Sequence, residues 1–189
     1  VDDGSTDGTP QILAEWSARE PRVRVLTQRP NQGYSKALAR GFADARFEAV
    51  FYTDADAQFD LAEIARLAPH LKSHDMVAGF RVGRKDPWVR LLTSRVYNLI
   101  QSLTLGIRVR DVNCAFKLFR RSFFDRVHLS SDGFLIDAEL YARARRAGLT
   151  WTQVGVTHRP RMAGSSTVKA ATVAATLSEL WRLRRSLGR

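Results

Sequence analysis

Apolar positions along the chain recur at two spacings, one typical of helices and one of strands, and the two kinds of segment alternate. The helical spacing predicts helices over 10–19, 35–46, 61–71, 88–105, 135–147 and 167–187. Short runs rich in β-branched and aromatic residues predict strands over 23–27, 49–53, 76–80, 116–119 and 150–156. Such alternation is typical of an α/β sandwich, in which helices flank a mostly parallel central sheet. We therefore expect one layered domain, with ligands at the carboxyl ends of its strands.

Length and composition support a single folded unit. The chain has 189 residues, of which 44% are hydrophobic and 26% charged, so a core can form and wholesale disorder is excluded. Cys114 is the only cysteine, which excludes an intrachain disulfide and a cysteine-based zinc cluster and fits a reducing, cytoplasmic setting. No apolar run approaches the roughly 20 residues that cross a bilayer. Because the chain opens on Val1 directly before a turn, we expect it to be a fragment.

The net charge of +11 predicts attraction to an anionic partner, whether nucleic acid, a phosphorylated ligand or an acidic membrane surface. This charge is concentrated in two segments of the chain. Residues 81–126 hold eleven Lys and Arg against three acids, and residues 159–189 hold seven against one. Most carboxylates lie instead in the first eighty residues. The chain therefore combines an acidic half, suited to a cation, with a basic half, suited to an anion.

Two acidic turns stand out in the first half of the chain. Asp54 and Asp56 follow the apolar run 49–53, so both carboxylates can face one cleft and bind a hard divalent cation, with Gln58 adding an amide oxygen. The alternative is a pair of solvated loop acids. The turn over residues 2–9, rich in Asp, Gly, Ser and Thr, can approach a ligand closely and accept hydrogen bonds from a base or ribose. Its alternative is an ordinary capped turn before a helix.

Together the two turns resemble, in order and spacing, the nucleotide-sugar site of inverting family 2 glycosyltransferases with the GT-A fold. Further segments resemble landmarks of the dolichol-phosphate and polyprenyl-phosphate hexosyltransferase branch. They are Asn31-Gln32-Gly33, Gly79-Phe80-Arg81, residues 111–116, residues 137–140 and residues 158–165. The resemblance covers residues 1–166 and implies a GT-A domain there, followed by a basic amphipathic helix over 167–189.

The chain departs from the family pattern at two places. The family begins with a strand and a Pro-x-x-Asn-Glu turn that help to hold the nucleoside, and neither is present, so the domain is expected to lack its first strand. Where the family commonly has Ser-Gly-Phe, this chain has Asn113-Cys114-Ala115-Phe116. The first departure leaves open a noncatalytic homologue, and the second leaves the acceptor open.

The resemblance also implies roles for individual residues, which are divided among donor, metal and acceptor. It implies that Asp2, Asp3, Gly4 and Ser5 face the nucleoside, and that Asp54, Asp56 and Gln58 hold Mg²⁺ or Mn²⁺ on the diphosphate. Arg81 and Arg95 match positions that hold an acceptor phosphate, and with Asp56 they form the expected catalytic set. The remaining substrate-binding positions are Asp111, Glu139, Arg159, Arg161 and Ser165.

The function implied is transfer of a hexose from a GDP- or UDP-sugar to a polyprenyl phosphate, by an enzyme bound peripherally to the cytoplasmic face of a membrane. A phosphate acceptor is already anionic near neutral pH and needs cationic positioning rather than a general base. A glycan or small-molecule hydroxyl acceptor remains the alternative within the same fold. A nucleic-acid-binding domain would be a different class, supported only by the charge and four tryptophans, and we expect no nucleic-acid partner. Sugar, nucleotide, choice of metal and oligomeric state stay open.

Overall fold

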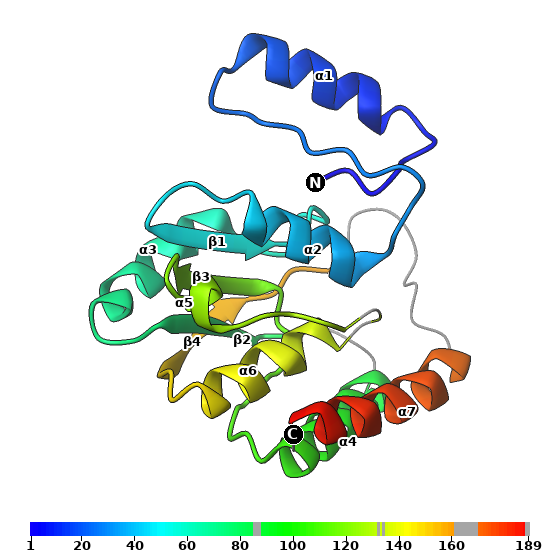
Figure 1. The fold of residues 1–189 in the computed structure, drawn as a ribbon, viewed down its shortest axis with the longest axis vertical. Helices are drawn as coiled ribbons and strands as arrows, with labels where there is room; N and C mark the ends of the chain where they lie inside the picture. Colours follow the sequence, from blue (N-terminus) through cyan, green and yellow to red (C-terminus); the bar gives the residue numbers. More distant parts are fainter. Residues whose placement is uncertain (85–87, 132, 134, 161–169, 188–189) are drawn as a thin grey trace.

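The structure is a computed structural model that describes residues 1–84, 88–131, 133, 135–160 and 170–187. Its centre is a four-stranded sheet in the order β1-β3-β2-β4 (Figure 1). The strands are β1 (Ala49–Thr53), β2 (Met76–Val82), β3 (Phe116–Arg120) and β4 (Trp151–Thr157). The helices are α1 (Thr9–Arg19), α2 (Tyr34–Ala43), α3 (Ile64–Leu67), α4 (Trp88–Leu105), α5 (Phe123–Arg126), α6 (Ile136–Arg146) and α7 (Ala170–Leu187). Short 3₁₀ turns, Leu61–Glu63 and Ala68–Lys72, flank α3.

The sheet is mixed, although most of its strands run in one direction. β3 is antiparallel to both β1 and β2, and β2 is parallel to β4. β1, β2 and β4 therefore point the same way, and β3 alone runs against them. As a result, the carboxyl ends of three strands and the loop that leads into β3 meet at one edge of the sheet, where parallel strands of α/β proteins bind ligands.

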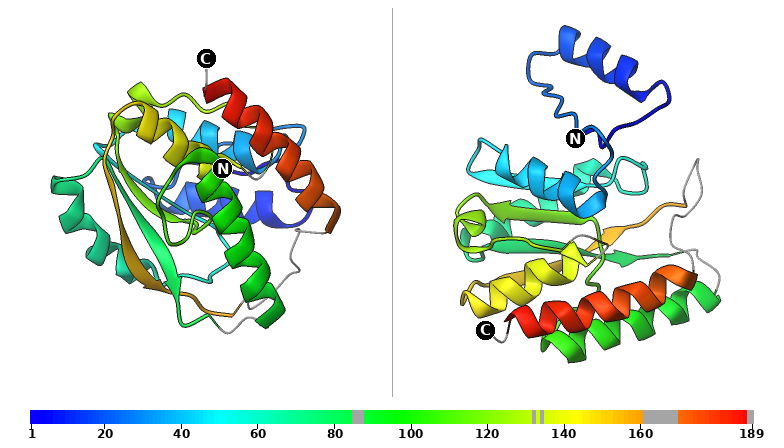
Figure 2. Two further views of the ribbon diagram at one scale, coloured as in Figure 1. Left: turned by 90° about the horizontal axis from the view of Figure 1, so that it is seen from below. Right: turned by 45° about the vertical axis from the view of Figure 1, so that its right-hand side comes forward.

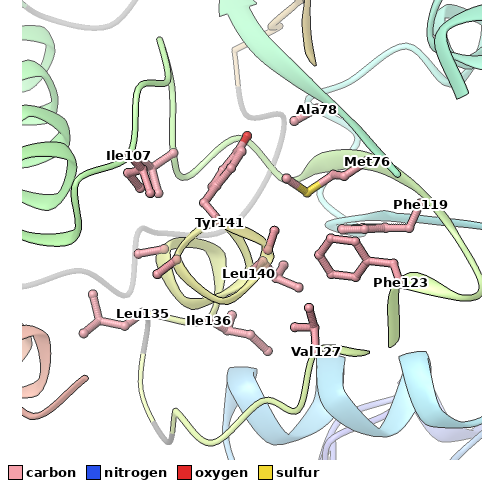
Figure 3. Packing of buried hydrophobic residues seen from close by; sticks show 14 of the residues in the cluster. Met76, Ala78, Ile107, Phe119, Phe123, Val127, Leu135, Ile136, Leu140 and Tyr141 are labelled. Carbon is pink, nitrogen blue, oxygen red and sulfur yellow. The ribbon is translucent and has the colours of Figure 1, made fainter. Parts of the chain in front are cut away.

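The two faces of the sheet are covered by different elements because side chains alternate along each strand. Val50, Tyr52 and Met76 point toward the larger core cluster, which also contains residues of α2 and α6. Figure 3 shows side chains of α6, such as Leu140, beside Met76 and Phe119 of the sheet. Val77, the residue after Met76 in β2, points to the opposite face of the sheet, where it packs with Leu67 of α3.

α4 and α7 lie side by side beyond α6, as both views of Figure 2 show. Leu180 and Leu183 of α7 are buried in the larger core cluster, so the helix packs on the domain. None of the described helices combines the length and apolar character that a membrane span requires.

The N-terminal segment projects from the rest of the domain (Figures 1 and 2). α1, which is described in full, contains no buried residue. The strand predicted over 23–27 is reduced to one parallel bridge between Asp2 and Thr27. Two hydrogen bonds accompany that bridge, from Asp2 N to Leu26 O at 2.8 Å and from Gln28 N to Asp2 O at 2.9 Å. The strand prediction was therefore wrong in extent, because the 23–27 segment finds only this short partner.

Candidate active site

The first acidic turn is built around Asp3, whose carboxylate holds the turn at 31–33. It accepts hydrogen bonds from Gln32 N at 2.8 Å and Gly33 N at 2.7 Å. Asn31 returns a bond from its Nδ2 to Asp3 O at 2.7 Å. Gly4 follows with φ +75°, and a Cβ there would lie 3.0 Å from Asn31 N. The close approach of the two segments therefore requires glycine at this position.

Asp2 presents a buried carboxylate that is only half satisfied. Asp2 is only 4% exposed to solvent, and its Oδ1 accepts a hydrogen bond from Ser5 N at 3.0 Å. Hydrogen bonding to Ser5 lowers the pKa of Asp2 below its ordinary value, so the group is ionised at neutral pH. Its Oδ2 has no hydrogen-bond partner among the described residues. A buried acceptor of this kind is suited to a polar ligand group.

The second acidic turn lies next to the first because Tyr34 connects them. Asp3 holds Gly33, and the neighbouring Tyr34 approaches Asp54, with its hydroxyl 3.3 Å from Oδ1. Burial raises the pKa of Asp54 to about 6, and the negative charges of Asp137 and Asp56 add to the shift. The turn at 31–34 therefore brings Asp3 and Asp54, which are 51 positions apart in the sequence, to one region of the molecule.

Asp56 and Gln58 belong to a loop that is tied to the end of β4. Gln58 N donates to Asp56 Oδ1 at 3.2 Å, and the intervening Ala57 has φ 56°. The side-chain nitrogen Nε2 of Gln58 donates to Arg159 O at 3.0 Å. The side-chain oxygen Oε1 is therefore the atom of Gln58 that would bind a cation. Arg159 also donates from Nη2 to Asp60 Oδ2 at 2.7 Å. Within the described residues, no three Asp, Glu, His or Cys side chains gather closely enough to form a metal centre by themselves.

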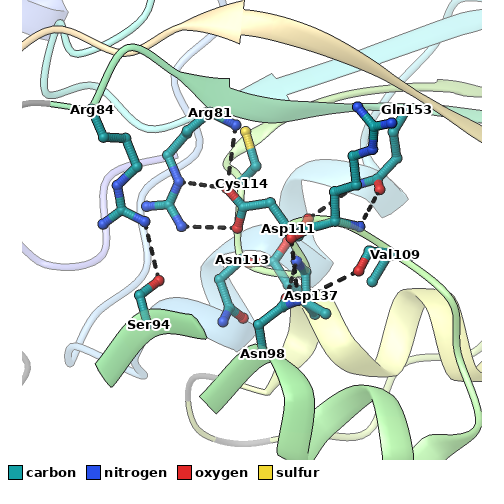
Figure 4. Close-up of polar contacts among 12 residues, drawn as sticks. Arg81, Arg84, Ser94, Asn98, Val109, Asp111, Asn113, Cys114, Asp137 and Gln153 are labelled. Atoms are coloured by element: carbon teal, nitrogen blue, oxygen red, sulfur yellow. Dashed lines mark hydrogen bonds and ion pairs between the residues drawn. The ribbon is translucent and has the colours of Figure 1, made fainter. Parts of the chain in front are cut away.

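Arg81, near the carboxyl end of β2, forms a two-point ion pair with Asp111 (Figure 4). Its Nε and Nη2 lie 2.7 and 2.9 Å from the two carboxylate oxygens. Burial alone would raise the pKa of Asp111, but hydrogen bonds and charge from Arg81 outweigh it, and the net shift is downward. Both groups therefore stay charged and fixed in orientation.

A groove of about 1440 Å³ extends from this ion pair between α4, the loop at 106–111 and the start of β4. Arg95 lines the groove from α4, and Arg84 donates to Ser94 at 3.1 Å beside it. Further arginines line its length, namely Arg108, Arg110 and Arg145. Asp111 is the only carboxylate among the described residues that line it. The groove is therefore strongly cationic, with apolar side chains of α4 along one wall.

Glu139 is fully buried and engaged by the protein itself. Its carboxylate accepts from Ser130 N at 2.9 Å, Ser131 N at 2.8 Å and Arg143 Nε at 2.6 Å. These contacts lower its pKa although burial acts in the opposite direction. Glu139 thus anchors the loop before α6 in this structure. Arg161 and Ser165, which were also predicted to bind substrate, lie outside the described residues.

Sequence reasoning missed a buried ion pair between Lys117 of β3 and Asp137 of α6. The ammonium nitrogen lies 2.5 Å from Asp137 Oδ1, and neither side chain is more than 5% exposed. Tyr52 also donates to the same carboxylate oxygen. The only signal in the sequence was a lysine inside the apolar run 116–119, where a charged residue needs a partner.

Residues 1–127 match the family model described as glycosyl transferase family 2. The polyprenol monophosphomannose synthase of Mycolicibacterium smegmatis is 27% identical over 207 residues, covering 100% of this chain and 77% of that protein. Glycosyltransferase AglD of Haloferax volcanii is 31% identical, covering 85% and 27%. The undecaprenyl-phosphate 4-deoxy-4-formamido-L-arabinose transferase of Aeromonas hydrophila is 33% identical, covering 66% and 39%. The chain thus spans well under half of the last two relatives.

Solved structures of glucosyl-3-phosphoglycerate synthase from Mycobacterium tuberculosis share the fold. The complex with phosphoglyceric acid superposes with a TM-score of 0.68 at 20% identity, covering 98% of this chain and 66% of that one. The complex with Mn²⁺, UDP-glucose and phosphoglyceric acid gives a TM-score of 0.71 at 19% identity, covering 96% and 66%. The expected fold class, GT-A, is confirmed. With a family match over residues 1–127 and this fold, the chain belongs to glycosyl transferase family 2.

Proposed function

We propose that this chain transfers a hexose from a nucleotide sugar to a polyprenyl phosphate, with inversion at the anomeric carbon. The observation that carries the proposal is the arrangement along one edge of the sheet. There, Tyr34 joins the two acidic turns, and the ion pair of Arg81 and Asp111 opens the cationic groove. Relatives named for transfer to polyprenyl carriers support the acceptor class.

The donor end is supported by the chemistry of the acidic turns. Asp2 offers a buried acceptor oxygen without a protein partner among the described residues, which suits a base or ribose. Asp54, Asp56 and Gln58 present two carboxylates and an amide oxygen, a hard-oxygen set that fits Mg²⁺ or Mn²⁺ when diphosphate oxygens complete the shell. When bound, such an ion neutralises charge on the departing diphosphate. These three residues would hold it.

The acceptor end is supported by the charge of the groove. A phosphate monoester can attack the anomeric carbon through its own oxygen while the bond from that carbon to the diphosphate breaks. What the protein must supply is orientation, and guanidinium groups offer paired donors at fixed geometry. We assign this role to Arg81 and Arg95, with Arg159 closing the donor side. The apolar wall of α4 suits a prenyl chain.

Peripheral attachment to a membrane is supported by a stripe of apolar side chains on α4. Trp88, Leu92, Val96, Leu99 and Leu103 follow one another at helical spacing and are 49–74% exposed. An amphipathic helix with apolar residues on one side and arginines beside them binds anionic bilayers. We propose the cytoplasmic face, with residues 1–166 as the transferase domain, followed by a C-terminal segment whose described part, α7, packs against α4.

The test incubates the full-length protein with Mn²⁺ or Mg²⁺, polyprenyl phosphate and a panel of labelled GDP- and UDP-sugars. We expect release of nucleoside diphosphate and a glycosylated lipid phosphate, identified by mass. Asp56→Ala should lower turnover at least about a hundredfold, whereas Asp125→Ala, an exposed carboxylate on α5, should leave it unchanged. Transfer only to hydroxyl compounds would replace the acceptor class, and undiminished turnover in Asp56→Ala would refute the metal role.

A further inference from the structure

The ammonium group of Lys117 forms several buried hydrogen bonds, and the transfer reaction proposed above assigns no role to this residue. Lys117 lies on β3, the strand that runs against the others, and its side chain is fully buried. Its nitrogen donates to Val112 O at 3.0 Å, Cys114 O at 2.7 Å and Asp137 Oδ1 at 2.5 Å. An ammonium has three protons, so every donor is used.

Two of these three bonds go to the backbone of the loop that precedes β3. The same loop is held from the other side by α4, because Asn98 Oδ1 accepts from Val112 N at 2.7 Å. Asn113 Nδ2 reaches Gln101 Oε1 at 3.2 Å. The loop is therefore clamped between Lys117 beneath it and the polar residues of α4 above it.

The clamped loop carries one half of the acceptor ion pair. Asp111 is bonded directly to Val112, and its carboxylate fixes both nitrogen arms of Arg81. A rotation of the peptide groups at Val112 would therefore move the Arg81 guanidinium. On its other side, Lys117 fixes Asp137, which receives the hydroxyl of Tyr52, two residues before Asp54.

A purely structural purpose does not require a cation at this position. A buried ion pair can be replaced by apolar groups of similar size with little loss of stability, whereas removal of one partner is costly. Lys117 also supplies what an apolar residue would lack, namely two directed bonds to the loop carbonyls. We infer that Lys117 is a positioning residue for the transfer reaction, holding the 111–114 loop so that Arg81 points at the acceptor phosphate. This inference rests on the proposed function.

The experiment compares full-length wild type with Lys117→Met, Asp137→Asn and the double variant. Each single change leaves a buried charge or an unpaired partner, so we expect melting about 10 °C below wild type. The double variant removes both charges and keeps an oxygen for Tyr52, so it should recover most of that stability. The kcat/KM of the double variant for polyprenyl phosphate should nevertheless remain about tenfold to a hundredfold below that of wild type, because its KM for the acceptor is raised. Its affinity for the nucleotide sugar should be unchanged.

Two further variants complete the design. Arg120→Met removes another cation of β3, which donates to the carbonyls of His74 and Lys72 at the far end of the strand. This control should leave the acceptor KM and the affinity for the nucleotide sugar unchanged. Asn98→Ala removes one of the two polar contacts between α4 and this loop without touching the ion pair, and it should also raise the acceptor KM.

Recovery of acceptor KM together with stability in the double variant would overturn the inference. An unchanged acceptor KM in Asn98→Ala would do the same, even if the double variant does not fold. If wild type fails to use polyprenyl phosphate, the proposed function fails instead, so the two failures are distinguishable.

Discussion

Asp54 is a carboxylate whose surroundings oppose its charge. Burial and the neighbouring charges of Asp137 and Asp56 raise its pKa to about 6. A raised pKa in the folded state means that the ionised form destabilises the protein at pH 7. The penalty is absent below the ordinary pKa of 3.8, grows as the pH rises, and is complete above about 6. A bound divalent cation would offset it, which is a reason for a metal ligand to tolerate such surroundings.

Asp54→Asn should therefore stabilise the metal-free protein while abolishing transfer. Raising the pKa of Asp54 from 3.8 to about 6 corresponds to about 3 kcal/mol, and partial exposure reduces our expectation to about 1–2 kcal/mol. Denaturant unfolding of both proteins at pH 7 and pH 4 measures the effect, which should be much smaller at pH 4 because that pH lies close to the ordinary pKa of 3.8. Equal stability at pH 7 would show that Asp54 is not strained by its charge.

Metal affinity should follow the same titration. Below a pH of about 6 the proton competes with the cation for Asp54, so the apparent affinity for Mn²⁺ should fall by up to about tenfold per pH unit. Calorimetric titration of the protein with Mn²⁺, in the presence of nucleoside diphosphate and at several pH values between 5 and 8, tests this expectation. A flat profile would indicate that Asp54 is not a ligand.

Among the secondary-structure elements, β2 and the loop before β3 are joined by the ion pair of Arg81 and Asp111, which we propose orients the acceptor phosphate. Arg81→Lys keeps the charge but replaces a two-point contact by a single one. We expect the KM for polyprenyl phosphate to rise about tenfold, with the donor KM unchanged. Arg40→Lys, in the exposed pair with Asp44 on α2, is the matched control. A rise of equal size in the control, or none in Arg81→Lys, would contradict the assignment.

The periodicity of the chain predicted the elements well where the local sequence determines the secondary structure. It predicted them less well where the structure depends on pairing with another strand. α4 begins and ends at the predicted residues, because its apolar stripe is long and uninterrupted. The 23–27 segment alternates like a strand, but a strand needs a neighbour and this one has only the bridge at Asp2. α5, with four residues, is too short to leave a periodic signal.

The candidate site was predictable to a similar degree. The sequence pointed to Asp54 because it follows the apolar run 49–53, and to Asp3 because its turn is rich in Asp, Gly, Ser and Thr and resembles the family's donor site. It could not show Tyr34 linking them, nor Lys117 bound to two carbonyls, because those contacts depend on how distant segments meet. Arg81 was assigned to a ligand, and its pairing with Asp111 also depends on the fold.

The molecule as a whole presents the stripe on α4 and the cationic groove next to each other, with Leu99 and Leu103 belonging to both. This arrangement would place the groove at the bilayer surface when α4 lies on it. Leu92→Glu combined with Leu103→Glu should weaken binding to phosphatidylglycerol vesicles at least about tenfold, because each buried leucine contributes about 1.5–3 kcal/mol.

Vesicle co-sedimentation at two salt concentrations measures this effect, and wild-type binding should weaken at high salt. The matched control is Leu61→Glu, since Leu61 is similarly exposed but lies in the 3₁₀ turn before α3. Equal loss in the control would mean that the attachment is not specific to α4.

The common direction of β1, β2 and β4 leaves the opposite edge of the sheet without any part of the proposed chemistry. Phe47, 81% exposed, lies on that edge just before β1. The natural thiol, Cys114, is buried, and burial raises its pKa to about 12, so it reacts poorly with alkylating reagents. The variant Phe47→Cys would therefore accept a fluorophore selectively, at the end of the sheet opposite the proposed chemistry.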